Sequence, residues 1–170
     1  MSRFIRIGPL VSERQRERVG GSIRCGREEG AKVLAGGGRP TGLDHGWFVE
    51  RTIFIDVDPS TRIAQEEIFR PVLSILTSFG DEGHAMAIAN YSSYGLGGSV
   101  FAADAEHALS VARRIRTGTV ELSGNLVGFY APTCGFKCNG IGRELGLEGF
   151  NVFVELKSYG LPPILAEALS

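Results

Sequence analysis

The run Gln65-Glu-Glu-Ile-Phe-Arg-Pro71 places two carboxylates and an aromatic ring just before an apolar stretch. A carboxylate accepts hydrogen bonds from two neighbouring sugar hydroxyls, and an aromatic ring covers the face of a planar heterocycle. The same residues also suit the solvated end of a short helical turn. The chemistry of Glu66, Glu67 and Phe69 therefore leaves both interpretations open, with the solvated turn as the simpler one.

The cysteines offer a second kind of chemistry. Cys134 and Cys138 are four residues apart, but structural zinc usually takes four ligands. The histidines are scattered over separate predicted elements, at His45, His84 and His107. No metal site is predicted. Lys137 would lower the pKa of a neighbouring thiol, so a thiol enzyme remains an alternative, although no base or oxyanion donor accompanies it.

The glycine-rich runs do not form nucleotide-binding motifs. In Gly140-Ile-Gly-Arg-Glu-Leu-Gly146, Leu145 stands where the dinucleotide fingerprint needs its third glycine, and no strand precedes the run. The run Gly36-Gly37-Gly38 lacks the Lys-Ser/Thr pair of a phosphate-binding P-loop. Both runs are predicted to be turns.

The composition is that of an ordinary globular protein: 170 residues, 43% hydrophobic and 22% charged, with a net charge of −1. Such a charge argues against a nucleic-acid partner, which needs a basic face. The first 27 residues hold seven Arg and two Glu, a bias that a solvated basic helix explains. No apolar run approaches the roughly 18 residues of a membrane span. Three cysteines, an odd and sparse set, favour reduced thiols in the cytoplasm.

The chain alternates between strand and helix signals. A Ser-x-x-Gln capping box at Ser12 predicts a surface helix to about Glu29, with a thin apolar stripe. Asp81 and Asp104 begin two further predicted helices. The predicted strands cover 31–35, 48–57, 71–77, 97–101 and 119–123, with a helical turn at 63–68. This order predicts an α/β fold.

The last 47 residues differ from the rest. The segment 124–149 is irregular and rich in glycine, which favours a functional or interfacial role. Residues 151–159 alternate between apolar and polar types and predict a strand. A strand standing alone at the end of a chain needs an edge to pair with, in this chain or in another.

Seven motifs in one order resemble the C-terminal portion of the aldehyde dehydrogenase superfamily, from about Ile7 to Tyr159. They are Ile7-Gly-Pro-Leu-Val-Ser, Glu28-Glu-Gly-Ala-Lys-Val-Leu-Ala-Gly-Gly, Trp47-Phe-Val-Glu with Thr52-Ile-Phe, Ile63-Ala-Gln-Glu-Glu-Ile-Phe, Tyr94-Gly-Leu, Arg116-Thr-Gly-Thr-Val and Gly140-Ile-Gly-Arg-Glu-Leu-Gly. The resemblance implies a catalytic-domain fragment, a mixed sheet with flanking helices that lacks the dinucleotide-binding domain. It further implies non-matching residues at 1–6, the C-terminal part of the catalytic domain at 7–150, and an oligomerisation strand with a tail at 151–170.

The resemblance implies NAD(P)-dependent oxidation of an aldehyde to a carboxylic acid. In that family a cysteine thiolate attacks the aldehyde, a hydride passes to the nicotinamide, and a glutamate activates water. Both catalytic groups precede the Ile7 motif in the family, so no catalytic residue is assigned and the isolated chain is expected to be inactive. Glu67 is implied to bind the nicotinamide ribose hydroxyls, and Phe69 to lie beside the nicotinamide of NAD or NADP.

The resemblance also implies partners. The family's terminal strand, here Val152 to Tyr159, pairs across subunits, so a homo-oligomer or a hetero-oligomer with full-length relatives is expected. The alternative function is a non-catalytic interaction protein that uses this strand.

Several positions depart from the family pattern. Arg70 replaces a glycine, Arg51 a proline, Thr133 an aromatic residue and Ser123 an asparagine, while Cys134 replaces a glycine. Scaffold motifs are retained and pocket-facing positions change. This pattern suggests a truncated copy under relaxed constraint.

Overall fold

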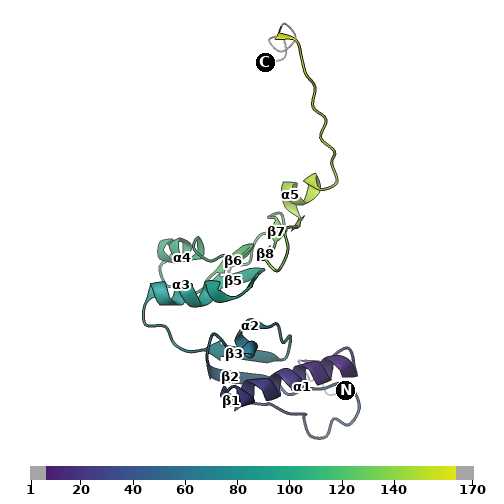
Figure 1. The fold of residues 1–170 in the computed structure, drawn as a ribbon, viewed down its shortest axis with the longest axis vertical. Helices are drawn as coiled ribbons and strands as arrows, with labels where there is room; N and C mark the ends of the chain where they lie inside the picture. Colours follow the sequence, from purple (N-terminus) through teal and green to yellow (C-terminus); the bar gives the residue numbers. More distant parts are fainter. Residues whose placement is uncertain (1–6, 164–170) are drawn as a thin grey trace. The chain divides into compact units, whose positions relative to one another are not determined.

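The computed structural model describes residues 7–163. They form two compact units, one ending at Ser93 and the other beginning at Tyr94 (Figure 1). The predicted non-matching residues 1–6 and the end of the predicted tail lie outside the described residues. No helix within 7–163 is long and apolar enough to cross a membrane.

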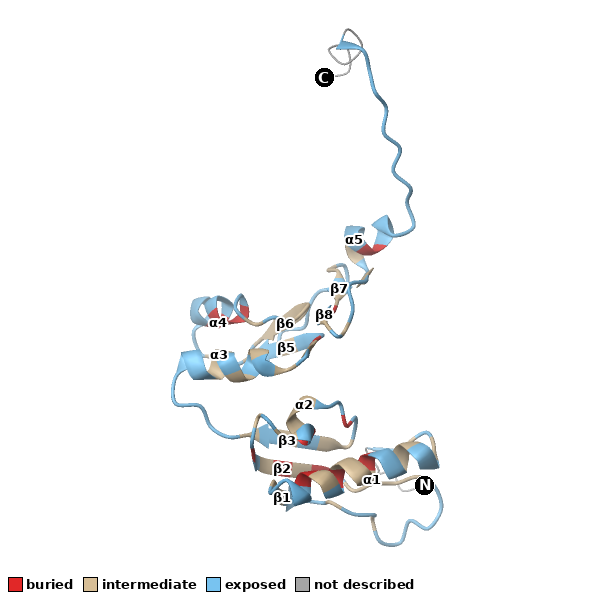
Figure 2. Ribbon diagram, in the orientation of Figure 1, coloured by how far each residue is buried: buried red, intermediate tan, exposed pale blue. Residues whose placement is uncertain are grey.

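The first helix, α1 (Glu13–Glu28), begins as its capping box predicts, because the Ser12 hydroxyl accepts a hydrogen bond from the Gln15 N–H at 3.3 Å. Its burial is greater than its thin stripe suggests. Val19, Ile23 and Gly26 are all buried (Figure 2). The helix is therefore part of the core and not only a surface element.

The sheet of the N-terminal unit has the order β1-β2-β3, from β1 (Lys32–Ala35), β2 (Thr52–Val57) and β3 (Val72–Leu76). Strands β1 and β2 are antiparallel, whereas β2 and β3 are parallel and joined through the short helix α2 (Arg62–Gln65). The predicted strand 48–57 begins only at Thr52, because Glu50 bonds instead to the glycine turn. Its N–H donates to the Gly38 carbonyl, and its carboxylate accepts from the Gly38 N–H.

One face of this sheet carries the core, and the other face is also apolar. Helices α1 and α2 contribute to a buried cluster of Val19, Ile23, Phe54, Val57, Ile63 and Ile68. On the strands' outward side, Leu34, Leu73 and Ile75 are 62%, 55% and 46% exposed. The residues alternate as a sheet requires, but apart from Lys32 at the start of β1 these outward positions are apolar. Within this unit the described residues leave an apolar sheet face open.

Helix α3 (Glu82–Tyr91) ends the N-terminal unit and is capped by Asp81, as predicted. In the C-terminal unit, β5 (Gly97–Val100) and β6 (Thr119–Leu122) are parallel and joined through α4 (Ala105–Ala112), whose cap is Asp104. The glycine-rich segment contains short elements that periodicity does not reveal: β7 (Thr133–Cys134), β8 (Phe136–Lys137), β9 (Arg143–Glu144) and α5 (Gly146–Asn151). Strand β8 pairs with β4 (Tyr94–Gly95), and β7 pairs with β9. The predicted α/β class is confirmed.

The predicted terminal strand is not a strand in the single chain. Asn151 ends α5, Val152 and Phe153 form a turn, and the described chain after them is exposed and contains no strand (Figure 1). A strand requires a second backbone to pair with its N–H and C=O groups, and no strand edge within residues 7–163 pairs with this segment. Pairing with another chain stays a prediction.

The close packing at Gly26 allows a test of how much the contact of α1 with α2 and β2 contributes to the stability of this unit. A Cβ at Gly26 would stand 2.8 Å from Ile63 Cδ1 and 3.2 Å from Phe54 Cζ. Gly26→Ala should lower the free energy of unfolding, because overpacking costs about 1–3 kcal/mol and exceeds the gain of up to about 1 kcal/mol in helix propensity. Urea denaturation measures the effect.

The matched control is Gly20→Ala in the same helix, where the new Cβ would meet only the Arg24 guanidinium, at 3.8 Å. That variant should be stabilised by up to about 1 kcal/mol. Equal shifts of the urea midpoint for both variants would contradict the packing argument.

Candidate functional site

The loop 66–70 between α2 and β3 presents both predicted cofactor residues. Ile68 is buried in the core cluster, while its neighbours Glu67 and Phe69 are exposed. The buried side chain fixes the loop against α1 and the sheet. Glu67 and Phe69 are therefore the exposed neighbours of one anchored residue.

Phe69 has an unusual backbone. Its φ is 70°, in the left-handed region that bulky L-residues disfavour by roughly 1–2 kcal/mol. Its ring is 62% exposed, so burial of the ring offsets little of this cost. Backbone outliers of this kind gather at functional sites, where the surrounding structure holds them in place. This observation favours a functional role for the loop over the simpler solvated turn.

The two glutamates of the motif have different surroundings. The Glu66 carboxylate accepts two hydrogen bonds from the Arg62 guanidinium, at 3.0 and 3.1 Å. This pair lowers the pKa of Glu66. The Glu67 carboxylate, in contrast, has no hydrogen-bond or ion-pair partner within residues 7–163. Glu67 is thus the carboxylate available to a ligand.

Sequence reasoning missed Arg18 as a part of this site. Its guanidinium donates a hydrogen bond to the Glu67 carbonyl oxygen at 3.1 Å, across 49 positions of the chain. The same side chain lines a polar cleft of about 310 Å³ with Cys25, Arg62 and Glu66. The only sequence feature that pointed to Arg18 is the excess of arginine in the first 27 residues. A solvated basic helix explains that excess without a role in a site.

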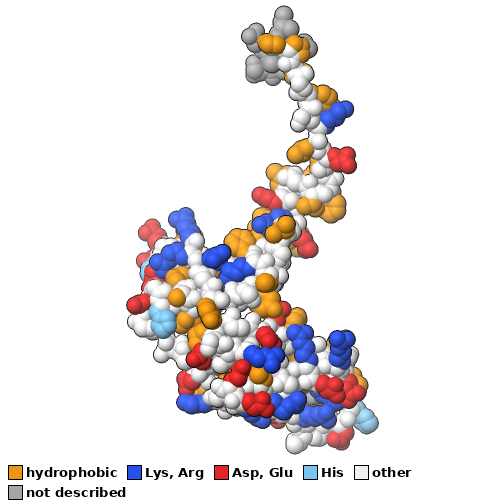
Figure 3. Space-filling model, viewed as in Figure 1, with side chains coloured by type: hydrophobic (Ala, Val, Ile, Leu, Met, Phe, Trp, Pro, Cys, Tyr) orange, Lys and Arg blue, Asp and Glu red, His pale blue; other side chains and the backbone are white. Residues whose placement is uncertain are grey.

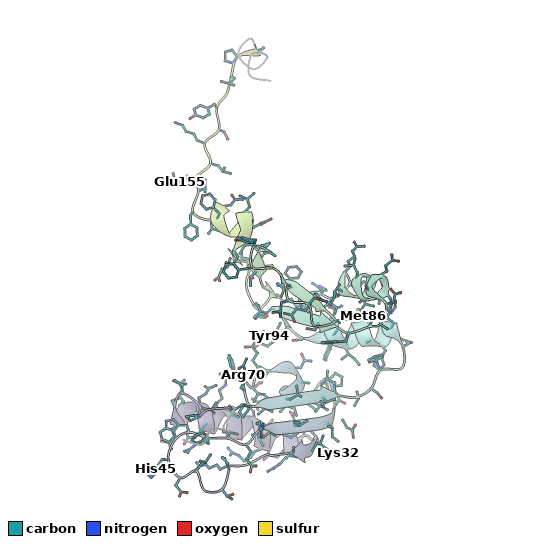
Figure 4. The ribbon with its side chains drawn as sticks, turned by 180° about the vertical axis from the view of Figure 1, so that it is seen from behind. Lys32, His45, Arg70, Met86, Tyr94 and Glu155 are labelled. Carbon is teal, nitrogen blue, oxygen red and sulfur yellow. The ribbon has the colours of Figure 1, made fainter. Side chains whose placement is uncertain are left out.

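Arg70 follows Phe69 at the end of the loop (Figure 4). Its side chain is exposed and makes no hydrogen bond or ion pair with the part of the chain that the structure describes. A positive charge therefore stands free next to the predicted nicotinamide position.

The cysteines do not assemble a nucleophilic site. Cys25 Sγ lies 3.8 Å from the Arg62 guanidinium, and Cys134 Sγ lies 3.6 Å from the Gly118 carbonyl oxygen, both half-buried. Cys138 is exposed. Within residues 7–163, no three His, Cys, Asp or Glu side chains gather as a metal site would require. Cys134 and Thr133 instead line an apolar hollow of about 750 Å³ together with Phe150 and Phe153.

The order of elements agrees with comparison to known proteins. The sequence model that describes the aldehyde dehydrogenase family matches residues 2–159 of this chain. The chain belongs to the aldehyde dehydrogenase family. The match extends five residues further toward the N-terminus than the motif at Ile7.

Individual relatives are similar over nearly the whole chain. The chain is 50% identical over 153 residues to a 3-succinoylsemialdehyde-pyridine dehydrogenase from Pseudomonas, and 47% identical over 152 residues to a geranial dehydrogenase from Castellaniella defragrans. These matches cover 89% of this chain but 32% and 31% of the relatives. The chain spans about a third of the length of the curated relatives it matches.

Solved structures give the same picture. An aldehyde dehydrogenase from Mycobacterium tuberculosis, complexed with NAD⁺, superposes with a TM-score of 0.88 at 50% identity, over 92% of this chain and 32% of that one. A C291A mutant of aldehyde dehydrogenase C from Pseudomonas syringae, complexed with NAD⁺ and octanal, has a TM-score of 0.84 at 45% identity, over 87% and 30%. The fold is that of aldehyde dehydrogenase catalytic domains.

The Arg62–Glu66 pair predicts a specific pH dependence of stability. Because the folded-state pKa of Glu66 lies below its ordinary value of 4.5, the stabilisation is complete above that pH and is lost as the pH falls through the lowered pKa. Glu66→Gln should therefore have a lower urea midpoint than the parent chain at pH 7. The difference should shrink as the pH falls below 4.5 and vanish once Glu66 is protonated in both the folded and the unfolded chain.

Urea denaturation of both proteins over this range of pH checks this expectation. A midpoint difference that stays constant down to the acid end would show that the charge of Glu66 is not its source.

Proposed function

We propose that this chain is the C-terminal part of an NAD(P)-dependent aldehyde dehydrogenase, which converts an aldehyde to a carboxylic acid. The observation that carries the proposal is that Glu67, with a carboxylate unpaired within residues 7–163, and the exposed Phe69 flank the buried Ile68 on one loop of a chain in this family. Relatives named for aldehyde oxidation, and relatives solved with NAD⁺, support it.

The residues of the loop fit a dinucleotide. An ionised carboxylate without a partner suits two ribose hydroxyls, and an exposed aromatic ring suits the face of a nicotinamide. When bound, NAD(P) supplies the acceptor for the hydride of the aldehyde. Arg18 and Ile68 keep the backbone of the loop in place, so that Glu67 and Phe69 meet the cofactor without first becoming ordered.

We propose that these 170 residues do not oxidise aldehydes by themselves. The family's attacking thiolate is assigned to none of Cys25, Cys134 and Cys138, and within residues 7–163 the contacts of their thiols include no base. The open sheet face of Leu34, Leu73 and Ile75 supports a role as part of a larger assembly, because contiguous exposed apolar surface marks an interface. The free thiols favour the cytoplasm.

The role of Glu67 is testable in a hybrid in which this chain replaces the matching third of the Mycobacterium tuberculosis enzyme. Glu67→Gln in the hybrid should raise the KM for NAD⁺ by about tenfold or more, since a hydrogen bond to a charged group contributes about 1.5–3 kcal/mol. Steady-state kinetics with varied NAD⁺ at saturating aldehyde measure it.

The matched control is Glu28→Gln, an exposed glutamate of α1 with no partner in the part of the chain described by the structure. It should leave the KM unchanged. An unaltered KM for Glu67→Gln would refute the assignment of Glu67. Steady aldehyde-dependent NADH formation by the pure 170-residue chain would refute the inactivity of the isolated chain.

A second candidate function is a non-catalytic interaction protein that pairs through residues 152–159. The observation that favours it is the exposed arm itself. Apolar side chains along it are exposed, and its backbone joins no strand within the described chain (Figure 4 labels Glu155 on this segment). An extended segment of this kind can add to the sheet edge of another subunit.

Val154→Pro tests this function, because proline removes the backbone N–H that a ladder needs. The variant should fail to co-purify with a tagged full-length relative, whereas the parent chain and the control Val154→Thr, which keeps its N–H, should be retained. Size-exclusion chromatography with light scattering reports the masses. Retention of the proline variant, or a parent chain that stays monomeric and unbound, would argue against pairing through this segment.

A further inference from the structure

A second cleft lies beside the basic helix α1, and its lining includes no residue of the loop 66–70. It has a volume of about 240 Å³ and lies between α1, the glycine turn and Val49. Charged side chains line it: Arg16, Glu17, Arg24 and Arg39. Lys and Arg side chains gather over α1, with carboxylates among them (Figure 3). The lining of the cleft holds three positive charges against one negative charge.

Two of these arginines are unsatisfied. Neither Arg24 nor Arg39 makes a hydrogen bond or ion pair within residues 7–163. The Arg24 guanidinium lies back along the helix, with its nitrogens 3.8 Å from the positions that Cβ atoms would take at Gly20 and Gly21. The two glycines leave room for this side chain beside α1. The result is a pair of free guanidinium groups, each a fork of donors that matches the oxygens of a phosphate.

Arg16 forms a fixed wall of the cleft. Its guanidinium bonds to the Glu13 carboxylate at 2.8 Å and stacks 4.7 Å from the centre of the Trp47 ring, and its side chain is 12% exposed. The glycine turn is also fixed, because Arg27 donates to the Gly37 carbonyl and Glu50 accepts from the Gly38 N–H. Glu13 and Glu50 are therefore engaged by other groups. Glu17 is the carboxylate that directly lines the cleft.

We propose that this cleft binds a phosphate-type dianion, either inorganic phosphate or the phosphate of a small monoester, through Arg24 and Arg39. The fixed Arg16 and glycine turn leave these two side chains as the adjustable donors. Pockets that enclose drug-sized ligands measure roughly 300–1,000 Å³, so a cleft of this size suits a phosphate group with a short organic part and not a whole nucleotide. The site is separate from Glu67 and Phe69, and it does not depend on the proposed oxidation.

Isothermal titration of the 170-residue chain with inorganic phosphate, at constant ionic strength set by sodium chloride, tests the site. We expect saturable binding that weakens by about tenfold or more in Arg24→Gln and in Arg39→Gln, because each loses a charge-assisted contact. Arg24→Lys should retain part of the affinity. The control is Arg14→Gln, an exposed arginine of α1 outside the cleft, which should bind as the parent does.

Glycerol 2-phosphate in place of inorganic phosphate distinguishes the two sources. Tighter binding of the ester assigns the cleft to a phosphorylated metabolite, and tighter binding of phosphate assigns it to the free ion. If the 170-residue chain aggregates, the same titrations are carried out with the hybrid enzyme, which contains the same cleft residues. Absence of saturable binding, equal affinity of all variants, or competition between phosphate and NAD⁺ in the hybrid would overturn the proposal.

Discussion

The close approach of α2 to α1 at Gly26 determines where the candidate site lies. Because residue 26 has no side chain, Ile63 of α2 and Phe54 of β2 reach the helix backbone. The same cluster includes Ile68, two residues beyond Glu66, the C-cap of α2. Burial of Ile68 fixes the path of the chain between its neighbours, and Glu67 and Phe69 are exposed as a consequence. The position of the polar site thus follows from an apolar contact on another element.

The difference between the two adjacent glutamates comes from the surrounding structure and not from their own chemistry. Glu66 lies one helical turn after Arg62, the spacing at which a carboxylate and a guanidinium meet on a helix surface. Glu67 is one residue too far for that pairing and lies next to the buried Ile68. One carboxylate therefore closes the end of α2, and the other stays available.

Much of this could be predicted from the sequence, because the signals are local. Caps at Ser12, Asp81 and Asp104 depend on side chains within three residues, and all three form. Strand cores follow from alternation, and the motif Glu-Glu-Ile-Phe carries the family resemblance. Three features could not be predicted, because each depends on residues far apart in the chain or on backbone geometry. The Arg18 bond spans 49 positions, the shortened start of β2 depends on a bond between Glu50 and Gly38, and the left-handed φ of Phe69 is a property of the folded loop.

Two exposed regions of the described chain, the apolar sheet face and the arm after α5, differ in the kind of surface that could cover them. The outward face of β1 and β3, with Leu34, Leu73 and Ile75, is apolar and non-directional, so any complementary apolar surface can cover it. The backbone of the arm after α5 is exposed to solvent within the described residues, and it can form a β-ladder only with a strand edge of matching direction and register. The apolar sheet face therefore places few restrictions on a neighbouring surface. The arm, in contrast, can pair only with a neighbour that presents a β-strand edge. Pairing of this arm with a strand edge of another chain stays a prediction, and it demands more of a neighbour than contact with the apolar sheet face does.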